Sequence, residues 1–546
     1  MTNTVIKMLP KLHNNPGLRL ASGAALTFFI ICSILNLHRY WSYYASFDQG
    51  LFNQLFWNSV HGNLFESSLS STLSTNVVHA KQAPEVFYSH IGQHFNPIFL
   101  LWMPIYAVFP YNETLIILQV LFVTFAGLVL YALARHYLQP MLAAMTTVSF
   151  YCTSTVNAPT LANFHDISAA PLLLFAVLLA MEKQKWWLFF LCAILLLAVR
   201  QDVGISLFSI GFYMLVSRRF PRMGLVVCFL SLGYILLVTQ YIMPKFSADV
   251  ARRMTIERFG QFTTNAEAST VDIILAILTN PMQLLGELFR GFPSKLGYIV
   301  VHSLALGIIP VLSSATWTTA GFPLLYLFLQ RASNALKISI RYAMPVVPGI
   351  FYGAIIWWST RQNLYKKPKI RRFWKTCIIL SLLVSILGNQ NSVFYFIIPD
   401  SISPLVYISI PEQWNHIHQF QSLIKQIPAN ASVSATTELI PKLSNRREIV
   451  RIPELRLIND TRQSITVEYI IADIWRHHKY QIAKKRPLLE DFFQFIDEVT
   501  NNQQYGIIGF ADGVILLKKS AISNSQATSA WLGFRKKSEV GSGNGL

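Results

Sequence analysis

The sequence predicts an α-helical polytopic membrane protein with a small α/β domain near its carboxyl end. Two observations predict this class. Hydrophobic residues make up 53% of the 546 residues and charged residues only 13%, whereas soluble domains carry roughly 25% charged residues. Apolar runs of about 18 to 20 residues, long enough to cross a bilayer, recur until about residue 390 and then stop. The composition therefore excludes an ordinary soluble enzyme.

The charge pattern points to lipid contact and not to nucleic acid. Lys and Arg number 45 against 26 Asp and Glu, a formal net charge of +19. Most of the basic residues flank apolar runs, where they signal topology and contact anionic headgroups. The five cysteines are widely separated and form neither a disulfide framework nor a zinc pattern.

The membrane part is predicted from the alternation of apolar runs and basic loops. Residues 1–19 are expected to be cytoplasmic because they hold Lys7, Lys11 and Arg19. Residues 20–390 are expected to form a multi-spanning domain of about eleven spans, with the amino terminus inside and the carboxyl terminus outside. Its first external loop, residues 38–112, is long and aromatic.

Each span is placed by its apolar run. The expected spans are 20–37, 113–134, 141–158, 167–181, 186–199, 203–216, 223–243, 296–313, 317–330, 343–360 and 373–388, and interfacial helices are expected over 94–110 and 272–290.

The tail is predicted to be soluble and extracytoplasmic. Residues 405–520 are expected to form a small α/β domain, with strands in 431–440, 467–474 and 505–519. In the last of these, Ala511-Asp512-Gly513 favours a hairpin turn. Residues 521–546 are rich in Ser, Asn and Gly and are expected to be disordered.

Asp48 is the first acidic candidate for chemistry. It lies in YYASFDQGLFNQLFWNSVHG (residues 43–62), whose apolar spacing predicts an amphipathic helix on the outer membrane surface. A carboxylate there could meet both a lipid headgroup and a water-soluble acceptor. The alternative is that Asp48 is the N-cap of this helix, because Asp is a favoured N-cap residue.

His90 and His94 form a second candidate, in YSHIGQHFNP. They are four residues apart, so on a helix they would share one face and could bind a metal or a phosphate. The alternative is that both histidines are hydrogen-bonded structural residues.

Two further groups follow at the second and third external loops. His165 and Asp166 lie in NFHD, and Arg200 and Asp202 lie in RQD. Ionisable groups near apolar spans are functional candidates by default. Arg200 and Asp202 could also simply pair with each other.

Four arginines run against the positive-inside tendency, since they are expected on the external side. Arg is suited to bidentate phosphate contacts, so these residues could hold a lipid phosphate or pyrophosphate. For Arg252 and Arg253 the alternative is general attraction to anionic headgroups. The full set is Arg252, Arg253, Arg258 and Arg341, and Tyr342 accompanies the last of them just before a span.

Longer segments of the chain are similar to a known family. They are FDQGLFNQLFW, HFNPIFLLWMPIYAVFP, NETLIILQVLFVTFAGLVLYALAR, NFHDISAAPLLLFAVLLA, RQDVGISLFSIG, IPANASVSATTELIPKLSNRREIVRIP and ADGVILLKK. With them the chain resembles an uncharacterised family of prokaryotic multi-spanning membrane proteins over residues 40–520. The chain departs from the family where Arg-Gln-Asp replaces the expected Lys-Glu-Asp at 200–202, which leaves Asp202 as the acid of that motif.

That family in turn resembles the GT-C glycosyltransferases, which use polyprenyl-phosphate sugars. The resemblance implies a transferase at the extracytoplasmic face of a prokaryotic plasma membrane. Asp48 would be the general base or a metal ligand, and Asp166 the acid of the second loop. A metal held by Asp48, Asp166 and His94 would be Mg²⁺ or Mn²⁺. The expected partners are membrane lipids and a polyprenyl-phosphate sugar donor. The alternative function is a transporter or flippase for a lipid-linked or small anionic substrate.

Overall fold

The computed structural model describes residues 15–77, 82–247, 249, 254–263, 268–332, 334–338, 340–387, 401–402, 405–406, 408–480 and 486–540. Its chain divides into two compact units. The helical unit comprises residues 1–36, 91–105 and 114–391, and the mixed unit comprises residues 37–90, 106–113 and 392–546.

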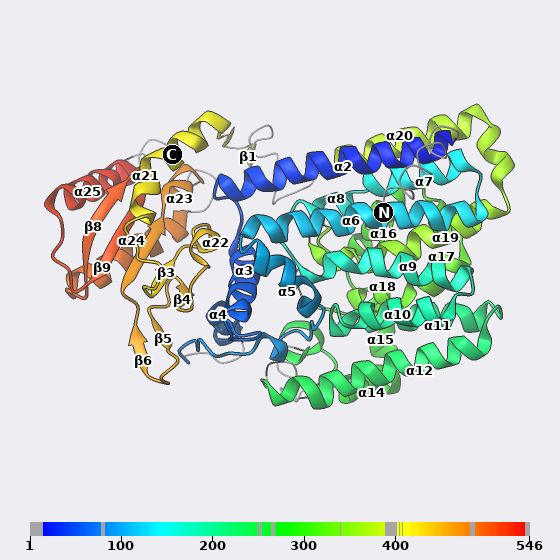
Figure 1. Ribbon diagram of the computed structural model, residues 1–546, viewed down its shortest axis with the longest axis horizontal. Coiled ribbons are helices and arrows are strands. Elements are labelled where there is room, and N and C mark those ends of the chain that lie inside the picture. The colour runs from blue at the N-terminus through cyan, green and yellow to red at the C-terminus, as the bar shows by residue number, and fades with distance from the viewer. Residues whose placement is uncertain are drawn as a thin grey trace. The chain divides into compact units, whose positions relative to one another are not determined.

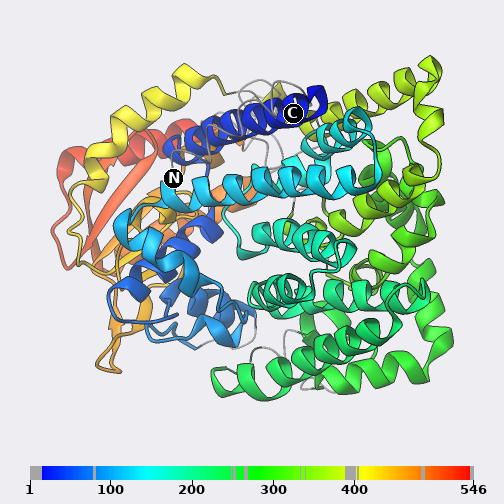
Figure 2. The same ribbon diagram turned by 45° about the vertical axis from the view of Figure 1, so that its right-hand side comes forward.

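The helical unit is built from helices that lie side by side, and both ribbon views show those of residues 112–237 next to one another in cyan to green (Figures 1 and 2). Its helices are α2 (Pro16–Trp41), α5 (Phe99–Val108), α6 (Asn112–Tyr137), α7 (Pro140–Tyr151), α8 (Ser154–Thr160), α9 (Ala170–Glu182), α10 (Trp186–Leu197), α11 (Gly204–Val216), α12 (Pro221–Leu237), α14 (Thr270–Thr279), α15 (Pro281–Phe289), α16 (Phe292–Leu304), α17 (Ser314–Thr319), α18 (Gly321–Phe328), α19 (Val347–Ser359) and α20 (Pro368–Leu387). The first residues of α6 and the last residues of α2 and α5 belong to the mixed unit.

Close packing of α11 against α12 depends on two glycines. A Cβ on Gly224 would lie 2.7 Å from the carbonyl oxygen of Gly211, and a Cβ on Gly211 would lie 2.9 Å from Cys228 Sγ. Small residues at such a contact let two backbones approach closely where lipid supplies no hydrophobic drive.

Fewer helices are long enough to cross a bilayer than the sequence led us to expect. Among the described residues three qualify by length and composition: α2, α6 and the continuous helical stretch Pro221–Lys245. The pair α14 and α15, bent by 93° at a short break, would make a fourth. The prediction of about eleven spans is therefore not supported.

Helix length is the physical reason for this difference. Helices α9, α10 and α19 have 13, 12 and 13 residues, and at about 1.5 Å per residue each is shorter than the hydrocarbon core of roughly 30 Å. The predicted span 141–158 is divided between α7 and α8. The apolar runs do form helices, but turns divide them into segments too short to span the bilayer.

The first predicted external loop does not stand alone. Most of it, residues 37–90, belongs to the mixed unit together with the carboxyl-terminal region. Helix α3 (Phe47–Val60) packs against α22 (Ile440–Leu443), and a Cβ on Gly50 would lie 2.5 Å from the side chain of Ile440. Helix α4 (Ser68–Val77) packs against β4 (Ile449–Arg451).

Helix α3 is consequently not the amphipathic surface helix that the sequence predicts. Ten of its 14 residues are buried, including the polar Gln49, Asn53 and Gln54. Their amides are satisfied internally, as when Gln49 Nε2 donates to Asn112 Oδ1 at 2.9 Å. A polar residue in such a helix marks a buried hydrogen bond and not a solvent face.

The mixed unit contains the predicted α/β region. Its main sheet has the order β4-β3-β7-β9-β8, where β3 is Val433–Ala435, β7 is Tyr469–Asp473, β8 is Tyr505–Ala511 and β9 is Val514–Lys519. Strand β3 runs parallel to both β4 and β7, and β9 is antiparallel to its neighbours. The predicted hairpin turn at Asp512-Gly513 joins β8 to β9, with φ of +82° at Gly513.

Further elements surround this sheet. Helices α24 and α25 pack against β8, and the core between them contains Phe493, Ile496 and Trp531. The other described elements of the unit are β1 (Ser401–Ile402), β2 (Leu405–Val406), α21 (Ile410–Ile424), β5 (Arg456–Ile458), β6 (Ser464–Thr466), α23 (Trp475–Tyr480), α24 (Arg486–Asn501) and α25 (Ser525–Val540).

The carboxyl-terminal tail is helical where the sequence predicts disorder. Residues 521–546 were expected to be disordered, but residues 525–540 form helix α25. Trp531 is 2% exposed and packs against Phe493 and Phe510. A few buried aromatic residues anchor a segment whose polar composition predicts disorder.

Candidate functional site

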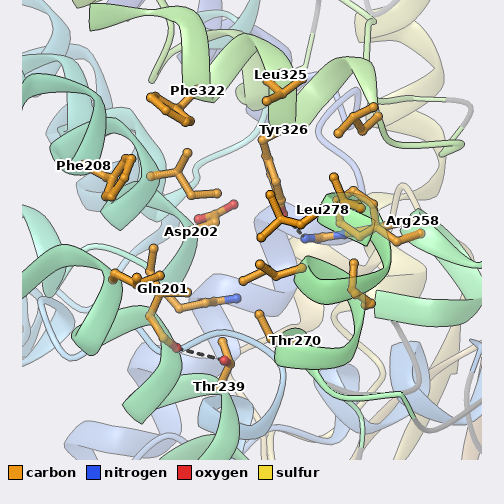
Figure 3. Close-up of a pocket in the computed structure, with 18 of the residues that line it drawn as sticks. Gln201, Asp202, Phe208, Thr239, Arg258, Thr270, Leu278, Phe322, Leu325 and Tyr326 are labelled. Carbon is orange, nitrogen blue, oxygen red and sulfur yellow. Dashed lines mark hydrogen bonds between the residues drawn. The ribbon is translucent and has the colours of Figure 1, made fainter. Parts of the chain in front are cut away.

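The helical unit holds an apolar cavity with one polar end (Figure 3). Its volume is about 330 Å³, within the range of small-molecule sites. Helices α11, α12, α14 and α18 supply most of its walls, and the apolar lining residues include Ile205, Phe208, Leu232, Ile235, Ile273, Ile274, Ile277, Leu278, Phe322, Leu325 and Leu329. Such walls suit an acyl or isoprenoid chain.

Charged and polar side chains gather at one part of this cavity. Gln93, His94, Gln201, Asp202 and Arg258 all line it. Figure 3 shows Asp202, Arg258 and Tyr326 around the same space, Asp202 from the start of the α11 segment and Tyr326 from α18. An apolar cavity whose lining includes a carboxylate and a guanidinium is typical of a site for an amphiphile.

Asp202 is held in place by Arg200. Arg200 Nε and Nη2 donate to the two carboxylate oxygens of Asp202, both at 2.7 Å. Arg200 is 1% exposed, whereas the side chain of Asp202 is 13% exposed and faces the cavity. The interpretation that Arg200 and Asp202 pair with each other is therefore confirmed, and the pair still presents one carboxylate to a ligand.

Asp166 lies behind Arg200. Arg200 Nη1 is 3.9 Å from Asp166 Oδ1, the amide of Ile167 donates to the same oxygen at 2.8 Å, and the Asp166 side chain is 2% exposed. Burial raises the pKa of Asp166, an effect that the charges of Arg200 and Arg341 oppose. Asp166 is not among the residues that line the two cavities described for the helical unit, whereas its neighbour Arg200 lines the smaller one.

His165 and Arg341 meet next to Asp166. Arg341 Nη1 lies 2.9 Å from His165 Nε2. Burial lowers the pKa of His165 well below its usual value, and the charges of Arg341 and Arg200 lower it further. The imidazole is therefore neutral and can accept a hydrogen bond from Arg341. The guanidinium groups of Arg341 and Arg200 both lie near the ring of Tyr342, at 5.2 and 5.7 Å from its centroid.

Arg258 is the arginine that faces the apolar cavity directly. It lies in the helical turn Met254–Phe259, and Arg258 Nη1 donates to the hydroxyl of Tyr326 at 2.7 Å. Among the residues that the structure describes, no carboxylate lies within ion-pair distance of Arg258. The nearby charge of Asp202 acts on it only at longer range. A partly buried guanidinium with a neutral partner can bind an anion without first breaking an ion pair.

A second, smaller cavity adjoins the same charged groups. Its volume is about 20 Å³, and Arg200, Asp202, Tyr326 and Tyr342 are among its lining residues. That volume suffices for roughly one water molecule.

Gln201 has a role that sequence reasoning missed. Its Oε1 accepts a hydrogen bond from the amide of Phe95 at 3.0 Å, and its Nε2 lies 3.3 Å from His94 Nδ1. Gln201 thus fixes residues 94–95 beside the cavity. Its position inside the RQD motif was the available signal, but the motif alone does not show that its partner is 106 residues away.

The two remaining first-loop candidates belong to the mixed unit. Asp48 lies in the first turn of α3, and the N-cap position is Ser46, so the N-cap interpretation is wrong. Asp48 is half-buried, and its charge acts on Arg451. His90 Nδ1 is 2.9 Å from Ser70 Oγ, and the His90 side chain is buried.

The predicted histidine pair does not form. His90 begins the short 3-10 helix His90–Gly92, which ends before His94, and the two histidines belong to different units. The i,i+4 spacing therefore does not place them on one helical face. Arg252 and Arg253 lie outside the described residues.

The expected metal ligands do not gather either. Within the described part of the chain, no group of three or more His, Cys, Asp or Glu side chains is placed to hold a metal ion. Asp166 and His94 belong to the helical unit and Asp48 to the mixed unit. The donor set of Asp48, Asp166 and His94 thus does not fit a metal site within either unit.

Comparison with known proteins identifies a family for this chain. A family model described as "Predicted membrane protein (DUF2079)" matches residues 39–516. No curated protein matches the chain. Since the match covers most of the sequence, the chain belongs to this family of predicted membrane proteins, in agreement with its long apolar helices.

Proposed function

We propose that this member of the DUF2079 family is a membrane glycosyltransferase that moves a sugar from a polyprenyl-phosphate donor to an acceptor. We place the reaction at the extracytoplasmic face of a prokaryotic plasma membrane. Arg258 carries the proposal: it is a partly buried cation beside an apolar cavity, and among the described residues it has no carboxylate partner.

The cavity supports both halves of such a donor. Its aliphatic and aromatic walls match an isoprenoid chain, which binds through the area it removes from water. Arg258 matches the phosphate, because a guanidinium offers planar paired donors to phosphate oxygens. Three arginines face two aspartates in this region, Arg200, Arg258 and Arg341 against Asp166 and Asp202, so one negative charge would balance them.

The transfer step follows from these positions. The acceptor oxygen forms a bond to C1 of the sugar, and the bond between C1 and the phosphate oxygen breaks. The phosphate leaves with the electron pair, and Arg258 neutralises its charge. The acceptor proton passes to a carboxylate, and a weak base suffices because the hydroxyl becomes acidic as the new bond forms.

Asp202 is the first candidate for that base, since it is the acid that lines the cavity. Asp48, the acid predicted from the resemblance, is the second. Asp166 and Arg341 are positioning residues in this proposal: Asp166 orients Arg200, and Arg341 is hydrogen bonded to neutral His165. No step is assigned to a metal ion.

Native mass spectrometry of the gently solubilised protein tests donor binding. We expect a co-purified polyprenyl phosphate, or its glycosylated form, on the wild-type protein. Its occupancy should fall by about tenfold in Arg258→Met, the loss expected when a charged hydrogen bond to an anion is removed. Arg290→Met is the matched control, because Arg290 is 60% exposed, pairs with Glu287 and does not line the cavity.

Two results would contradict the proposal. One is that only bulk phospholipid binds at high occupancy of intact protein. The other is that polyprenyl phosphate binds equally to Arg258→Met and Arg290→Met. Either result removes Arg258 as the phosphate contact and with it the main support for a lipid-linked donor.

A transporter or flippase of a lipid-linked substrate is the second candidate. The break between α14 and α15 favours it, because bent and discontinuous helices line the substrate sites of many transporters, and α14 supplies part of the cavity wall. Reconstituted vesicles separate the two functions. A transporter moves a labelled polyprenyl-phosphate sugar across the bilayer without forming a new glycosidic bond, whereas a transferase releases polyprenyl phosphate.

A further inference from the structure

The mixed unit contains a second group of charged side chains that the proposed reaction does not use. Three cations each lie against an aromatic ring of residues 40–47. Lys442 Nζ is 3.5 Å from the ring centroid of Tyr40, and the guanidinium carbons of Arg451 and Arg476 are 4.9 and 3.1 Å from those of Phe47 and Tyr44. Cation–π contacts hold the side chains in place without using up their hydrogen-bond donors.

Two of these cations and one neighbouring acid have unused hydrogen-bonding capacity. Within the described residues, neither Lys442 nor Arg451 has a side-chain hydrogen bond or an ion pair, and neither does Glu438. All three are half-buried. Glu438 and Asp48 are close enough for their charges to act on Arg451, yet both lie beyond ion-pair distance from it.

The sheet places these residues at an edge where ligands commonly bind. Glu438 follows the carboxyl end of β3, and Arg451 is the last residue of β4, which runs parallel to β3. The next parallel strand, β7, pairs with the opposite side of β3. β3 is therefore the middle of three parallel strands, and Glu438 and Arg451 lie at or just beyond the carboxyl ends of two of them, the end of a parallel sheet at which ligands commonly bind.

The presence of both cations and carboxylates at this site indicates which kind of ligand it can bind. A phosphate would satisfy Lys442 and Arg451, but Glu438 and Asp48 would repel it. A hydroxyl group both donates and accepts hydrogen bonds, so a ligand with several hydroxyls can accept from the cations and donate to the carboxylates. A saccharide has this property, and it could hydrogen bond both to Glu438 and to Arg451, which do not pair with each other.

We propose that the mixed unit binds a saccharide at the carboxyl ends of β3 and β4, through Glu438, Lys442 and Arg451. As the site that holds a glycan acceptor, it rests on the proposed function. The binding itself requires neither a donor nor the cavity of the helical unit.

Saturation-transfer NMR on the detergent-purified full-length protein tests this proposal. The probes are the methyl glycosides of mannose, glucose, galactose and arabinose, with glycerol as an acyclic polyol control. We expect at least one glycoside to bind, and its Kd to rise about tenfold in Arg451→Met and in Glu438→Gln, because each loses a hydrogen bond to a charged group. Lys518→Met is the matched control: Lys518 is an exposed lysine near the ring of Tyr469 in the same unit.

Glu438→Gln is nearly isosteric, so it keeps the test valid if Arg451→Met does not fold. The proposal is overturned if no glycoside binds, or if the Kd is the same in both variants and in Lys518→Met. It is also overturned if inorganic phosphate binds and glycosides do not. Asp202→Asn separates this site from the transferase proposal, because that variant should lose transfer and retain glycoside binding.

Discussion

Two buried charge clusters of the helical unit look alike in composition and differ in how fully they are satisfied. In the first, Glu182 at the end of α9 accepts hydrogen bonds from Arg219, at 2.9 and 2.7 Å, and from the hydroxyls of Tyr137 and Tyr352. In the second, Asp202 accepts two hydrogen bonds from Arg200 and faces the apolar cavity.

This difference in hydrogen bonding indicates that the Glu182 cluster has a structural role and that the Asp202 cluster can bind a ligand. Both oxygens of Glu182 are occupied by a cation and phenols, and the side chain is 0% exposed, so nothing is left for a ligand. Around Asp202, the guanidinium of Arg258 donates to a phenol and, within the part of the chain that the structure describes, has no carboxylate at ion-pair distance; the side chain of Asp202 is 13% exposed. A charged cluster whose hydrogen bonds are all made within the protein holds helices together. A cluster beside a cavity that keeps unused hydrogen-bonding capacity can bind a ligand.

The largest expected effect is a loss of transfer rate when Asp202 is substituted. We expect Asp202→Asn to lower the transfer rate by about 100- to 10,000-fold, the range for loss of a general base, and also to lower Tm, because the buried guanidinium of Arg200 loses its carboxylate partner. A radiolabelled-donor assay on purified protein measures this. Asp48→Asn is run in parallel, and if it loses activity while Asp202→Asn keeps it, the base lies in the mixed unit and not at the cavity.

The second effect is on stability at Glu182. We expect Glu182→Gln to lower the free energy of unfolding by about 2 kcal/mol, because a buried acceptor of four hydrogen bonds loses its charge; the 37% exposure of Arg219 limits the cost. Thermal unfolding in detergent measures it. Glu287→Gln, in a pair with the 46% exposed Arg331, is the control with a smaller loss. If the folded Glu182→Gln protein lost transfer as completely as Asp202→Asn, the comparison would fail.

The third effect compares Arg258 with its hydrogen-bond partner Tyr326 in the cluster around Asp202. Arg258→Met should raise the donor KM about tenfold, through loss of a charged hydrogen bond. Tyr326→Phe should raise it by a smaller factor, since the hydroxyl only orients Arg258. Steady-state kinetics with varied donor give both values. Equal effects of the two changes would assign the phosphate contact to the phenol.

The smallest effect concerns a third cluster, in the mixed unit. His416 lies between two acids, with Nδ1 2.8 Å from Asp512 and Nε2 3.4 Å from Asp473. Burial lowers the pKa of His416, but hydrogen bonds to Asp473 and Asp512 outweigh it, and the net pKa is raised. The raised pKa adds stability that is fully present below the ordinary His pKa and is lost as pH rises through the folded value.

The Tm of the mixed unit should therefore fall by about 2–4 °C as pH rises from 6 to 9. Differential scanning fluorimetry across that range measures it. His416→Gln should remove this part of the pH dependence, and His418→Gln, at an exposed position two residues further along α21, should retain it. A slope that survives in His416→Gln would place the titration elsewhere.

The sequence predicted the class of the protein well and its internal partners poorly. Composition and apolar runs are local properties, so they predicted a helical membrane protein with a carboxyl-terminal α/β region. The cluster around Asp202 was only partly predictable: each acid and arginine was visible near an apolar run, but His165 and Arg341 are 176 residues apart. Nothing in the spacing showed that Arg258 would meet Tyr326.

Two errors have the same physical origin. The apolar spacing of residues 43–62 predicted an amphipathic helix on the membrane surface, and the Ser-, Asn- and Gly-rich tail predicted disorder. In both cases distant segments supply the missing contacts: α22 covers α3, and the core around Phe493 receives Trp531. A hydrophobic pattern predicts which face of a helix is buried only when the segment that packs against it is known. In this chain those segments come from remote parts of the sequence.

The mixed unit is assembled from both ends of the chain, which has a consequence for biosynthesis. Ser68 Oγ donates to the carbonyl oxygen of Ile449 at 2.6 Å, across a separation of 381 residues. At about 5–20 residues per second, a ribosome needs roughly 20 to 80 seconds to make the second partner after the first. During that interval α3 and α4 exist without the strands and helix that cover them. We therefore expect premature truncation of the chain to leave the early segment uncovered and open to proteolysis.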